Sequence, residues 1–455
     1  MRFQNYVIIN LIYKNFKGSY MSKKNTKTKG DIMMERVESQ FWAYKIDNDC
    51  ASNDCSSKDL VLLDNVQFIY ELSLAELELK ALNVDFEVTN GLREFKILNK
   101  SDEQKELIKR KGAYYKTVDG QFTDYFQIIQ KNRTRSVNQY LTHWIYPYKG
   151  KFHPQMIRAL LNIIRLKEGD TVFEPFSGSG TTALEAQLLG VNFIGIDISP
   201  LCVIQGRVKT ESIYVINEIK KLKDEIVKNI RYNLFQTNDN YYNFLNELTA
   251  DERVKNFFIL ARLLAVSDSS RRNRDFIGSF IKNVDIMILS VEDYIDIKEK
   301  LNLRLGDVKI EVGDSRNIKL PDNSIDGIIT SPPYSIALDY VQNDDHSLRD
   351  LGYNVLKMRD DFIGVRGNGG NKVSLYNEDM KKSYSEMYRV LKPNRYAVIV
   401  IGNATYQGKE IPTVEFTIEY MENIGFVLEK NINKIIFGLY NVMKKENILI
   451  FKKVK

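Results

Sequence analysis

The sequence predicts an α/β fold: a mostly parallel sheet with helices on its faces, an antiparallel hairpin at its C-terminal edge, a helical insertion and an N-terminal accessory region. Three observations predict it. From about residue 138 onward, short apolar runs typical of buried strands alternate with runs of helical spacing. The alternation pauses over residues 210–300, where helical spacing dominates. The last two apolar runs are too close together for a crossover helix, which predicts a hairpin.

The individual elements follow from the period of the apolar residues. The first unit is a strand, a glycine-containing loop, a helix and a second strand, which is a βαβ unit of a parallel sheet. Helical spacing predicts helices over 72–82, 156–165, 183–189, 257–266, 380–391 and 414–423. Buried apolar runs predict strands over 171–173, 191–197, 308–312, 325–330, 396–402, 433–437 and 447–451.

Composition agrees with a folded chain. Hydrophobic residues make up 44% and charged residues 27% of the 455 residues, which excludes wholesale disorder. Only 9 Pro and 25 Gly exclude collagen-like and proline-rich architectures. The net charge of +6 only slightly favours a polyanionic partner. We expect a flexible arm over residues 1–35, an accessory or recognition region over 36–137, and the α/β domain with its insertion over 138–455.

Cysteine usage and hydropathy indicate where in the cell the protein is expected. Three cysteines are too few for a disulfide framework, which favours a reducing cytoplasm, and no zinc-ligand spacing is found, so we expect no metal. No run reaches the roughly 18 apolar residues that span a bilayer, so no membrane partner is expected. The run from Tyr6 to Tyr13 is interrupted by Asn10 and lacks a cleavage site, which argues against a signal peptide; Met21 could be the true start.

A glycine loop follows the first strand of the α/β domain. The segment Glu174-Pro-Phe-Ser-Gly-Ser-Gly-Thr-Thr-Ala183 lies where an α/β sheet binds ligands, and Gly178 and Gly180 allow a close backbone approach. Asp197 ends the next strand, where a carboxylate can accept both hydroxyls of a ribose. The pattern G-x-G-x-x-A also fits a nicotinamide or flavin site, and a turn without ligand is the plain alternative. An acidic side chain in the loop suits a cationic ligand better than a pyrophosphate.

The segment Ser331-Pro-Pro-Tyr334 follows the strand 325–330 directly. Two prolines end the strand and leave the carbonyl of Pro332 free to accept a hydrogen bond, the Ser331 hydroxyl is a second acceptor, and Tyr334 offers a flat face. These groups suit an exocyclic amino group on an aromatic ring. An ordinary strand-terminating turn is the alternative. Because neighbouring strand ends share one crevice, we expect this segment to face the glycine loop.

The two motifs together resemble those of the amino-methyltransferases of DNA, which use S-adenosylmethionine (SAM) and modify cytosine N4 or adenine N6. Here Glu174 stands where the family usually has Asp. The resemblance implies a class I, Rossmann-like methyltransferase fold, with the ribose on Asp197 and the adenine amino group on Asp314. Phe152-His-Pro154 resembles the remaining cofactor motif. The implied cofactor residues are Glu174, Phe176, Gly178, Gly180, Thr181, Asp197 and Asp314, and the implied catalytic residues are Ser331, Pro332, Pro333 and Tyr334.

Within that family, serine before the prolines suggests cytosine N4, with adenine N6 left open. Some tRNA guanine-N2 methylases share the layout, so RNA stays a less favoured alternative. Methylation at cytosine C5 is excluded because no cysteine follows a proline. The implied partners are double-stranded DNA with its target base flipped out and a cognate restriction endonuclease, as in a restriction–modification system.

The family usually carries a long target-recognition segment, yet this sequence ends at its predicted hairpin. Recognition would then fall to the N-terminal region, to the insertion or to a loop over 342–376. Six basic residues could contact phosphates: Lys131, Arg133, Arg135, Arg271, Arg272 and Arg274.

Overall fold

The computed structural model describes residues 59–454 except 99–100, 133–135, 137, 149, 232–237, 334–339, 368–370, 407–408 and 438–442. Residues 57–455 form one compact unit. Several expectations lie outside the described residues: the arm over 1–35, the start at Met21, and the side chains of Cys50, Cys55, Arg133, Arg135 and Tyr334.

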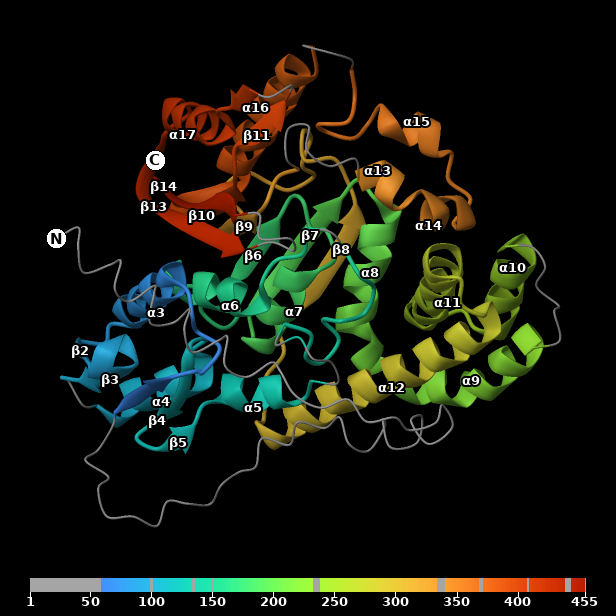
Figure 1. Cartoon of the computed structure of the whole chain (residues 1–455), viewed down its shortest axis with the longest axis horizontal. Coiled ribbons are helices and arrows are strands. Elements are labelled where there is room, and N and C mark those ends of the chain that lie inside the picture. The colour runs from blue at the N-terminus through green and yellow to red at the C-terminus, as the bar shows by residue number, and fades with distance from the viewer. Residues whose placement is uncertain are drawn as a thin grey trace, which may run out of the picture. The chain divides into compact units, whose positions relative to one another are not determined.

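A central sheet organises the described part of the chain. Its seven strands follow the order β13-β14-β10-β9-β6-β7-β8, from left to right in Figure 1. The order β8-β7-β6-β9-β10 is the 3-2-1-4-5 order of a doubly wound fold, and these strands are parallel. The chain reverses its direction of winding between β6 and β9, and ligands of such sheets bind outside the carboxyl ends of the strands at that point. The strands are β6 (Thr171–Glu174), β7 (Asn192–Asp197), β8 (Val308–Val312), β9 (Ile325–Thr330), β10 (Leu391–Ile401), β13 (Phe426–Phe437) and β14 (Met443–Lys453).

The predicted C-terminal hairpin is confirmed. Strands β13 and β14 pair antiparallel from Phe426 with Lys453 to Phe437 with Met443. The last strand, β14, lies between β10 and β13 and runs antiparallel to both, so the edge of the sheet is β13. The carboxyl end of β13 and the start of β14 therefore lie at the same edge as the carboxyl ends of β6 and β9.

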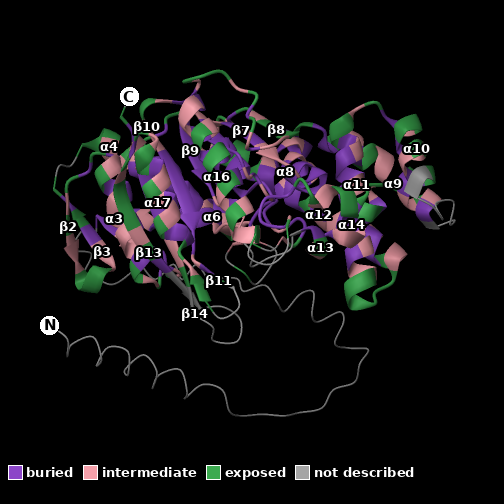
Figure 2. Ribbon diagram, turned by 90° about the horizontal axis from the view of Figure 1, so that it is seen from above, coloured by how far each residue is buried: buried purple, intermediate pink, exposed green. Residues whose placement is uncertain are grey.

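Helices cover both faces of the sheet, because alternate residues of each strand point to opposite faces. On β10, Val398 and Val400 belong to one core and Ile399 and Ile401 to the other. The first core includes α6 (Pro154–Ile163), α7 (Thr181–Leu188) and α8 (Pro200–Glu211), and the second includes α16 (Asn371–Val390) and α17 (Thr413–Asn423). Figure 2 shows buried residues concentrated in the sheet and on the inward sides of these helices.

The N-terminal region contains a second sheet of five described strands in the order β2-β3-β1-β4-β5, all antiparallel. It contacts the α/β domain through a buried polar cluster: Asn162 of α6 donates to Glu78 Oε1 at 2.7 Å, and Glu78 also accepts the N–H of Ala113 at 3.0 Å. The elements are β1 (Leu60–Leu62), α3 (Ile69–Ala81), β2 (Phe86–Thr89), η1 (Asn90–Leu92), β3 (Glu94–Ile97), α4 (Asp102–Lys111), β4 (Tyr115–Val118), β5 (Gln121–Phe122) and α5 (Asp124–Gln130).

The predicted helical insertion is present between α8 and β8. Its α11 packs against α8 and α12, and Figure 1 shows it beside the β8 edge of the sheet. It comprises η2 (Ser212–Tyr214), α9 (Ile216–Arg231), α10 (Asn238–Leu248), α11 (Glu252–Arg272) and α12 (Phe276–Lys300). No helix in the described part of the chain is long and apolar enough to cross a membrane.

One expectation about the connection after β9 is wrong. The segment 342–376 is not a loop, because it contains two short helices, the end of a third and the start of α16. Apolar residues such as Leu348 and Val355 are buried there, which gives these turns a packing face. The short helices are α13 (Tyr340–Asn343), α14 (Asp345–Asp350) and α15 (Val355–Arg359), and a small hairpin follows β10, with strands β11 (Ala404–Tyr406) and β12 (Lys409–Ile411).

Candidate active site

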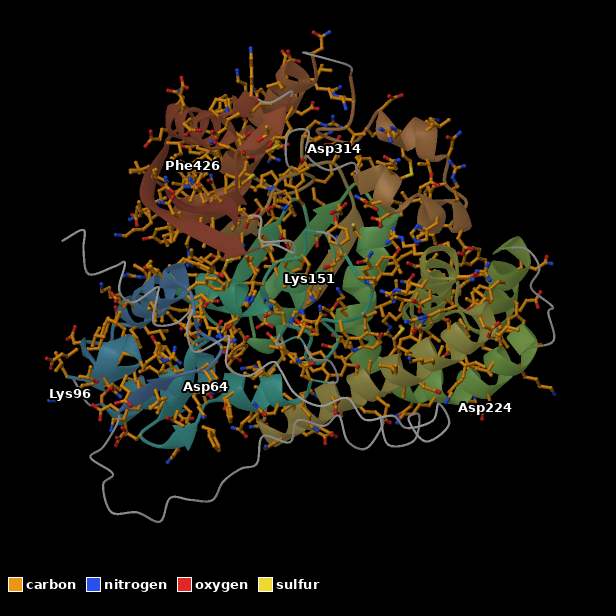
Figure 3. The ribbon with its side chains drawn as sticks, viewed as in Figure 1. Asp64, Lys96, Lys151, Asp224, Asp314 and Phe426 are labelled. Atoms are coloured by element: carbon orange, nitrogen blue, oxygen red, sulfur yellow. The ribbon has the colours of Figure 1, made fainter. Side chains whose placement is uncertain are left out.

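A cavity of about 430 Å³ opens at the carboxyl ends of the parallel strands, around the point between β6 and β9. This volume is within the range of small-molecule sites. Figure 3 labels Lys151 and Asp314, two of the residues that line it. Of the predicted site residues, Glu174, Phe176, Gly178, Thr181, Asp197, Asp314, Ser331 and Pro333 all line this cavity.

Asp197 joins the two predicted parts of the cofactor site. Its Oδ2 accepts the N–H of Gly178 at 2.8 Å, and its Oδ1 accepts the N–H of Ser199 at 2.9 Å. Burial raises the pKa of Asp197 to about 6, although both hydrogen bonds act in the opposite direction. The carboxylate therefore holds the glycine loop against the end of β7, and each oxygen keeps a second lone pair for a ligand.

The two glycines of the loop have different surroundings. A β-carbon on Gly178 would lie 3.2 Å from the Tyr148 ring, which also lines the cavity. Gly180 has φ +75°, and a β-carbon there would lie 2.6 Å from Cα of Gly206 on α8. The absence of a side chain at Gly180 thus lets α7 and α8 pack closely together. A contact between Gly180 and a cofactor stays a prediction.

The glycine loop contains polar atoms that need a ligand. Glu174 Oε2, Ser177 Oγ, Ser179 Oγ and Thr181 Oγ1 are buried and have no hydrogen-bond partner among the described residues. Buried polar groups are nearly always hydrogen-bonded in native proteins, so such a cluster at a cavity wall indicates a bound polar molecule. Burial, and then the charge of Asp197, raise the pKa of Glu174 well above its usual range. A cationic ligand would stabilise its ionised form.

Asp314 follows β8 and is held by a neighbouring arginine. Arg316 Nε donates to Asp314 Oδ1 at 2.9 Å, and Nη2 donates to Oδ2 at 2.7 Å. Burial alone would raise the pKa of Asp314, but the hydrogen bonds and the charge of Arg316 outweigh it and the pKa is lowered. Asp314 is therefore an ionised, oriented acceptor at the cavity wall, as an adenine amino group requires.

The serine–proline segment enters the cavity from β9. Ser331 and Pro333 line it together with Gly178, whereas Pro332 is buried and is not among the lining residues. This places Ser331 in the same space as the glycine loop, which is the arrangement that shared strand ends predict. The role of the Pro332 carbonyl stays a prediction. Tyr334 lies outside the described residues, and its role stays a prediction.

Three residues that line the cavity, Lys151, Lys434 and Glu446, and one that supports its glycine loop, Lys209, were not predicted from the sequence. Lys151 precedes the Phe152-His-Pro154 motif, and burial lowers its pKa to about 7. Lys209, fully buried on α8, donates to the carbonyl of Ser179 at 2.7 Å and so holds the glycine loop. Lys434 and Glu446 contribute an ion pair from the C-terminal hairpin. The position of Lys151 directly before a predicted cofactor motif could have indicated that it lies at the site. Nothing in the sequence around Lys209 distinguishes it from an exposed lysine of a helix.

The predicted phosphate contacts are partly engaged within the protein. Arg272 and Arg274 both pair with Asp268, at 2.8 and 3.3 Å, and each side chain is more than half exposed. Arg271 donates to the carbonyl of Asn343. Lys131 pairs with Asp293 at 3.4 Å and with Asp296 at 3.2 Å. Their contact with nucleic acid stays a prediction.

Comparisons with known proteins agree with the motifs. A family model described as DNA methylase matches residues 3–205. The Type II methyltransferase M.MjaII of Methanocaldococcus jannaschii is 41% identical over 95 residues, which are 21% of this chain and 17% of that protein. M.BsoBI of Geobacillus stearothermophilus is 26% identical over 285 residues, 49% of this chain and 55% of that protein.

Two further matches broaden the picture. A tRNA (guanine(10)-N2)-dimethyltransferase of Methanocaldococcus jannaschii is 31% identical over 126 residues, 28% of this chain and 31% of that protein. A solved SAM-dependent methyltransferase from Methanosarcina mazei is 11% identical and covers 64% of this chain and 94% of its own, with a TM-score of 0.29. This chain spans 17%, 55% and 31% of the three named relatives, at most about half of any one of them.

A parallel sheet in this strand order, with a glycine loop after its first strand, an acidic residue at the end of its second and a reversed strand in its terminal hairpin, is the fold of class I methyltransferases. The residues present fit SAM, the cofactor that the resemblance implies: an acidic and hydroxyl-rich loop for its cationic part and two carboxylates for its nucleoside part. The chain is similar to the DNA methylase family over residues 3–205, which are somewhat less than half of its 455 residues.

Proposed function

We propose that this protein methylates an exocyclic amino group of a base in double-stranded DNA, with cytosine N4 as the target, in a restriction–modification system. The observation that carries the proposal is that Ser331 and Pro333 line the same cavity as Gly178 and Asp197. A target amino group and a methyl donor can therefore meet in one enclosed space, and positioning of this kind supplies much of a transfer reaction's acceleration.

The protein's own groups have separate tasks in this proposal. When bound, SAM would supply an electrophilic methyl carbon for attack by an amino nitrogen, with the thioether sulfur of the donor as the leaving group. The hydroxyl of Ser331 and the carbonyl of Pro332 accept the two amino hydrogens, which keeps the nitrogen lone pair directed at the donor. Each such hydrogen bond contributes about 0.5–1.5 kcal/mol, so alignment matters more than their strength. Tyr334 stacks on the extruded base. This stacking contributes roughly 1–3 kcal/mol, which offsets part of the free energy needed to flip the base out of the duplex.

The choice of base rests on the residue before the prolines. Serine there favours cytosine N4 by the resemblance, and adenine N6 is the alternative within the same chemistry. The buried state of Cys202 supports exclusion of cytosine C5, because burial raises the pKa of its thiol well above the usual range and C5 chemistry needs a thiolate. A guanine-N2 activity on tRNA is a second candidate, favoured by the likeness to the tRNA methylase. A cognate endonuclease and a cytoplasmic location stay predictions.

Nucleoside mass analysis tests the proposal directly. DNA and tRNA from cells that express the chain are digested and compared with those from cells that express Ser331→Ala. We expect N4-methylcytosine in DNA from the wild type and its loss in the variant. Labelled-methyl transfer by the purified chain must give the same product.

Tyr334→Ala separates cofactor binding from base binding. We expect its SAM affinity to equal that of the wild type while turnover falls by about 10- to 100-fold or more, the loss of base stacking. Equal loss of both would contradict the role given to Tyr334. Methylated guanine in tRNA with unmodified DNA would instead establish the second candidate.

A further inference from the structure

We infer that the ion pair between Lys434 and Glu446 reads the ring edge of the extruded base and makes the site selective for cytosine. This inference rests on the proposed function, since it needs a base in the cavity. It concerns a wall of the cavity that neither sequence motif supplies.

The pair is built into the C-terminal hairpin. Lys434 of β13 and Glu446 of β14 are directly opposite each other in the register, and Lys434 Nζ lies 2.7 Å from Glu446 Oε2. Both side chains are largely buried, with exposed fractions of 9% and 15%, yet both line the cavity. An ion pair withdrawn from water in this way is weak evidence for a stabilising role, because desolvation of two charges offsets most of their attraction.

The position of the pair in the sheet separates it from the cofactor residues. The loops that hold Gly178, Asp197 and Asp314 follow β6, β7 and β8, which lie on one side of β9. The hairpin lies on the other side, beyond β10. Ser331, which follows β9, is therefore between the cofactor residues and the pair, and a base held at Ser331 has the pair on the side away from the methyl donor.

The strand between them, β10, also lines the cavity. Thr330 is paired with Ile399, so Val400 of β10 is level with Ser331, and Val400 lines the cavity. Two residues further along, Gly402 has no side chain, and a β-carbon there would lie 2.7 Å from the carbonyl oxygen of Lys445 and 3.5 Å from Glu446 Cγ, so the hairpin approaches β10 closely at this point. Strands are spaced about 4.8 Å apart, so β13 lies about 14 Å from β9, a distance that an extended lysine side chain and a base anchored at β9 bridge together.

The chemistry of the pair matches one base. Next to its amino group, cytosine presents N3 and then O2, which are both acceptors for an ammonium group. Adenine presents N1 and then a C–H group, so it offers one acceptor. Guanine, held by its N2 amino group, presents N1–H on one side, a donor that an ammonium group repels. Flipped bases are read by hydrogen bonds to this edge. Glu446 keeps Lys434 in place and accepts one of its three N–H donors, leaving the others for the base.

The test uses duplexes that differ only at the target base pair, with the recognition sequence read from the modified DNA of expressing cells. Single-turnover methyl transfer to cytosine and to adenine at that position is measured for the wild type and for Lys434→Gln. We expect the variant to transfer to cytosine about 10- to 100-fold more slowly, the loss of one charge-assisted hydrogen bond, and to change little toward adenine. SAM affinity, measured by calorimetry, should stay unchanged.

Two further variants exclude a merely structural effect. Lys430→Gln, an exposed lysine of the same strand, should leave every rate unchanged. The double variant Lys434→Gln with Glu446→Gln leaves no lone charge in the wall, so a structural defect would be repaired while a lost base contact would not. Recovery of the cytosine rate in the double variant overturns the inference. So does a wild type that methylates adenine as well as cytosine, although amino-methylation of DNA would then still stand. A wild type that methylates no DNA overturns both.

Discussion

The carboxylate of Asp197 and the backbone of Gly178 are joined by a 2.8 Å hydrogen bond, so the residue that the resemblance assigns to the ribose also holds the loop that surrounds the cofactor. The second oxygen of Asp197 accepts from Ser199 at 2.9 Å. These two bonds lower the pKa of Asp197, but burial is the larger effect and raises it to about 6. Protonation of the Asp197 carboxylate thus affects both the shape of the glycine loop and its affinity for a ligand.

We predict that SAM affinity falls as the pH drops below about 6. The ionised carboxylate is the better acceptor for ribose hydroxyls, and below its pKa the affinity should decline by up to about tenfold per pH unit. Calorimetric titration with SAM between pH 5 and 8 measures this. Asp197→Asn should bind SAM weakly at every pH and lack this step. A wild-type affinity that is flat across this range would contradict the assignment.

The same titration has the opposite effect on stability. Because the folded pKa of Asp197 is above the unfolded value, the folded state binds more protons than the unfolded state between pH 4 and pH 6. The stability linked to this proton is complete below the unfolded pKa and is lost as the pH rises through about 6. Urea unfolding of wild type and Asp197→Asn should differ in this slope, with the variant less dependent on pH. The ligand-free protein is the sample to use, since SAM favours the ionised form.

Gly180→Ala should destabilise the protein more than Gly169→Ala. Both glycines have positive φ, +75° and +86°, which costs a non-glycine residue about 1–2 kcal/mol. Only at Gly180 would the new β-carbon meet backbone, at 2.6 Å from Gly206, whereas Gly169 has open space around it. We expect an additional loss of about 1–3 kcal/mol at Gly180 from overpacking, measured by urea unfolding. Equal losses would show that α7 and α8 can move apart freely.

The centre of the sheet was largely predictable because its strands are buried on both faces and so appear as uninterrupted apolar runs. Strand β9 is buried at every position, and its predicted bounds, 325–330, agree with the structure. Strand β13 was predicted to begin at 433 but begins at Phe426, because residues such as Glu429 and Lys430 are exposed at the sheet edge and interrupt the pattern. Edge strands carry such polar residues, so their apolar pattern is interrupted and their bounds are difficult to predict from it.

The site was predictable where its residues belong to one chain segment, and not where distant segments meet. The glycine loop and the serine–proline segment each follow a strand, so the topology alone places them at one edge. Lys434 and Glu446 could not be inferred in this way, because they reach the cavity from the C-terminal hairpin, which is far in sequence from both motifs. Tertiary proximity of this kind leaves no period or spacing in a single sequence.

Arg262→Met should loosen the insertion from the wall of the active site. Arg262 of α11 makes two hydrogen bonds of 3.0 Å to Asp350 of α14, and both side chains are 8% exposed. Leu348 of α14 lines the cavity, so this pair connects the insertion to it. Methionine keeps the packing but leaves a buried carboxylate without its cation, which costs about 3–5 kcal/mol. We expect a lower unfolding midpoint and weaker SAM binding.

A matched control lies on the same short helix. Arg349 pairs with Asp345 at 2.8 Å, but the arginine side chain is 63% exposed, and such surface pairs contribute little. Arg349→Ala should therefore leave the unfolding midpoint unchanged. If both variants behaved alike, burial would not be what makes the Arg262 pair important.

Glu174→Gln should separate ligand binding from stability. The carboxyl group of Glu174 is buried, and Oε2 has no hydrogen-bond partner in the described part of the chain. Its raised pKa, caused by burial and by Asp197, indicates that ionisation is unfavourable until a cation enters the cavity. Glutamine keeps the shape but cannot become negative. We expect SAM affinity to fall by about 10- to 100-fold, the loss of one charge-assisted interaction, while stability without ligand stays equal or rises.

Glu185→Gln provides the contrast, because this equally buried glutamate of α7 does not line the cavity and its Oε1 is hydrogen-bonded within the protein. Tyr140 and His143 both hydrogen-bond to its Oε1, and Arg158 lies 3.6 Å from its Oε2. The Glu185→Gln variant should therefore have a lower unfolding midpoint than the wild type, since the substitution disturbs a buried hydrogen-bond network. Calorimetry with SAM and urea unfolding on both variants distinguish the two effects. If Glu174→Gln bound SAM as tightly as the wild type, the acidic loop would have no role in recognising the cationic part of the cofactor.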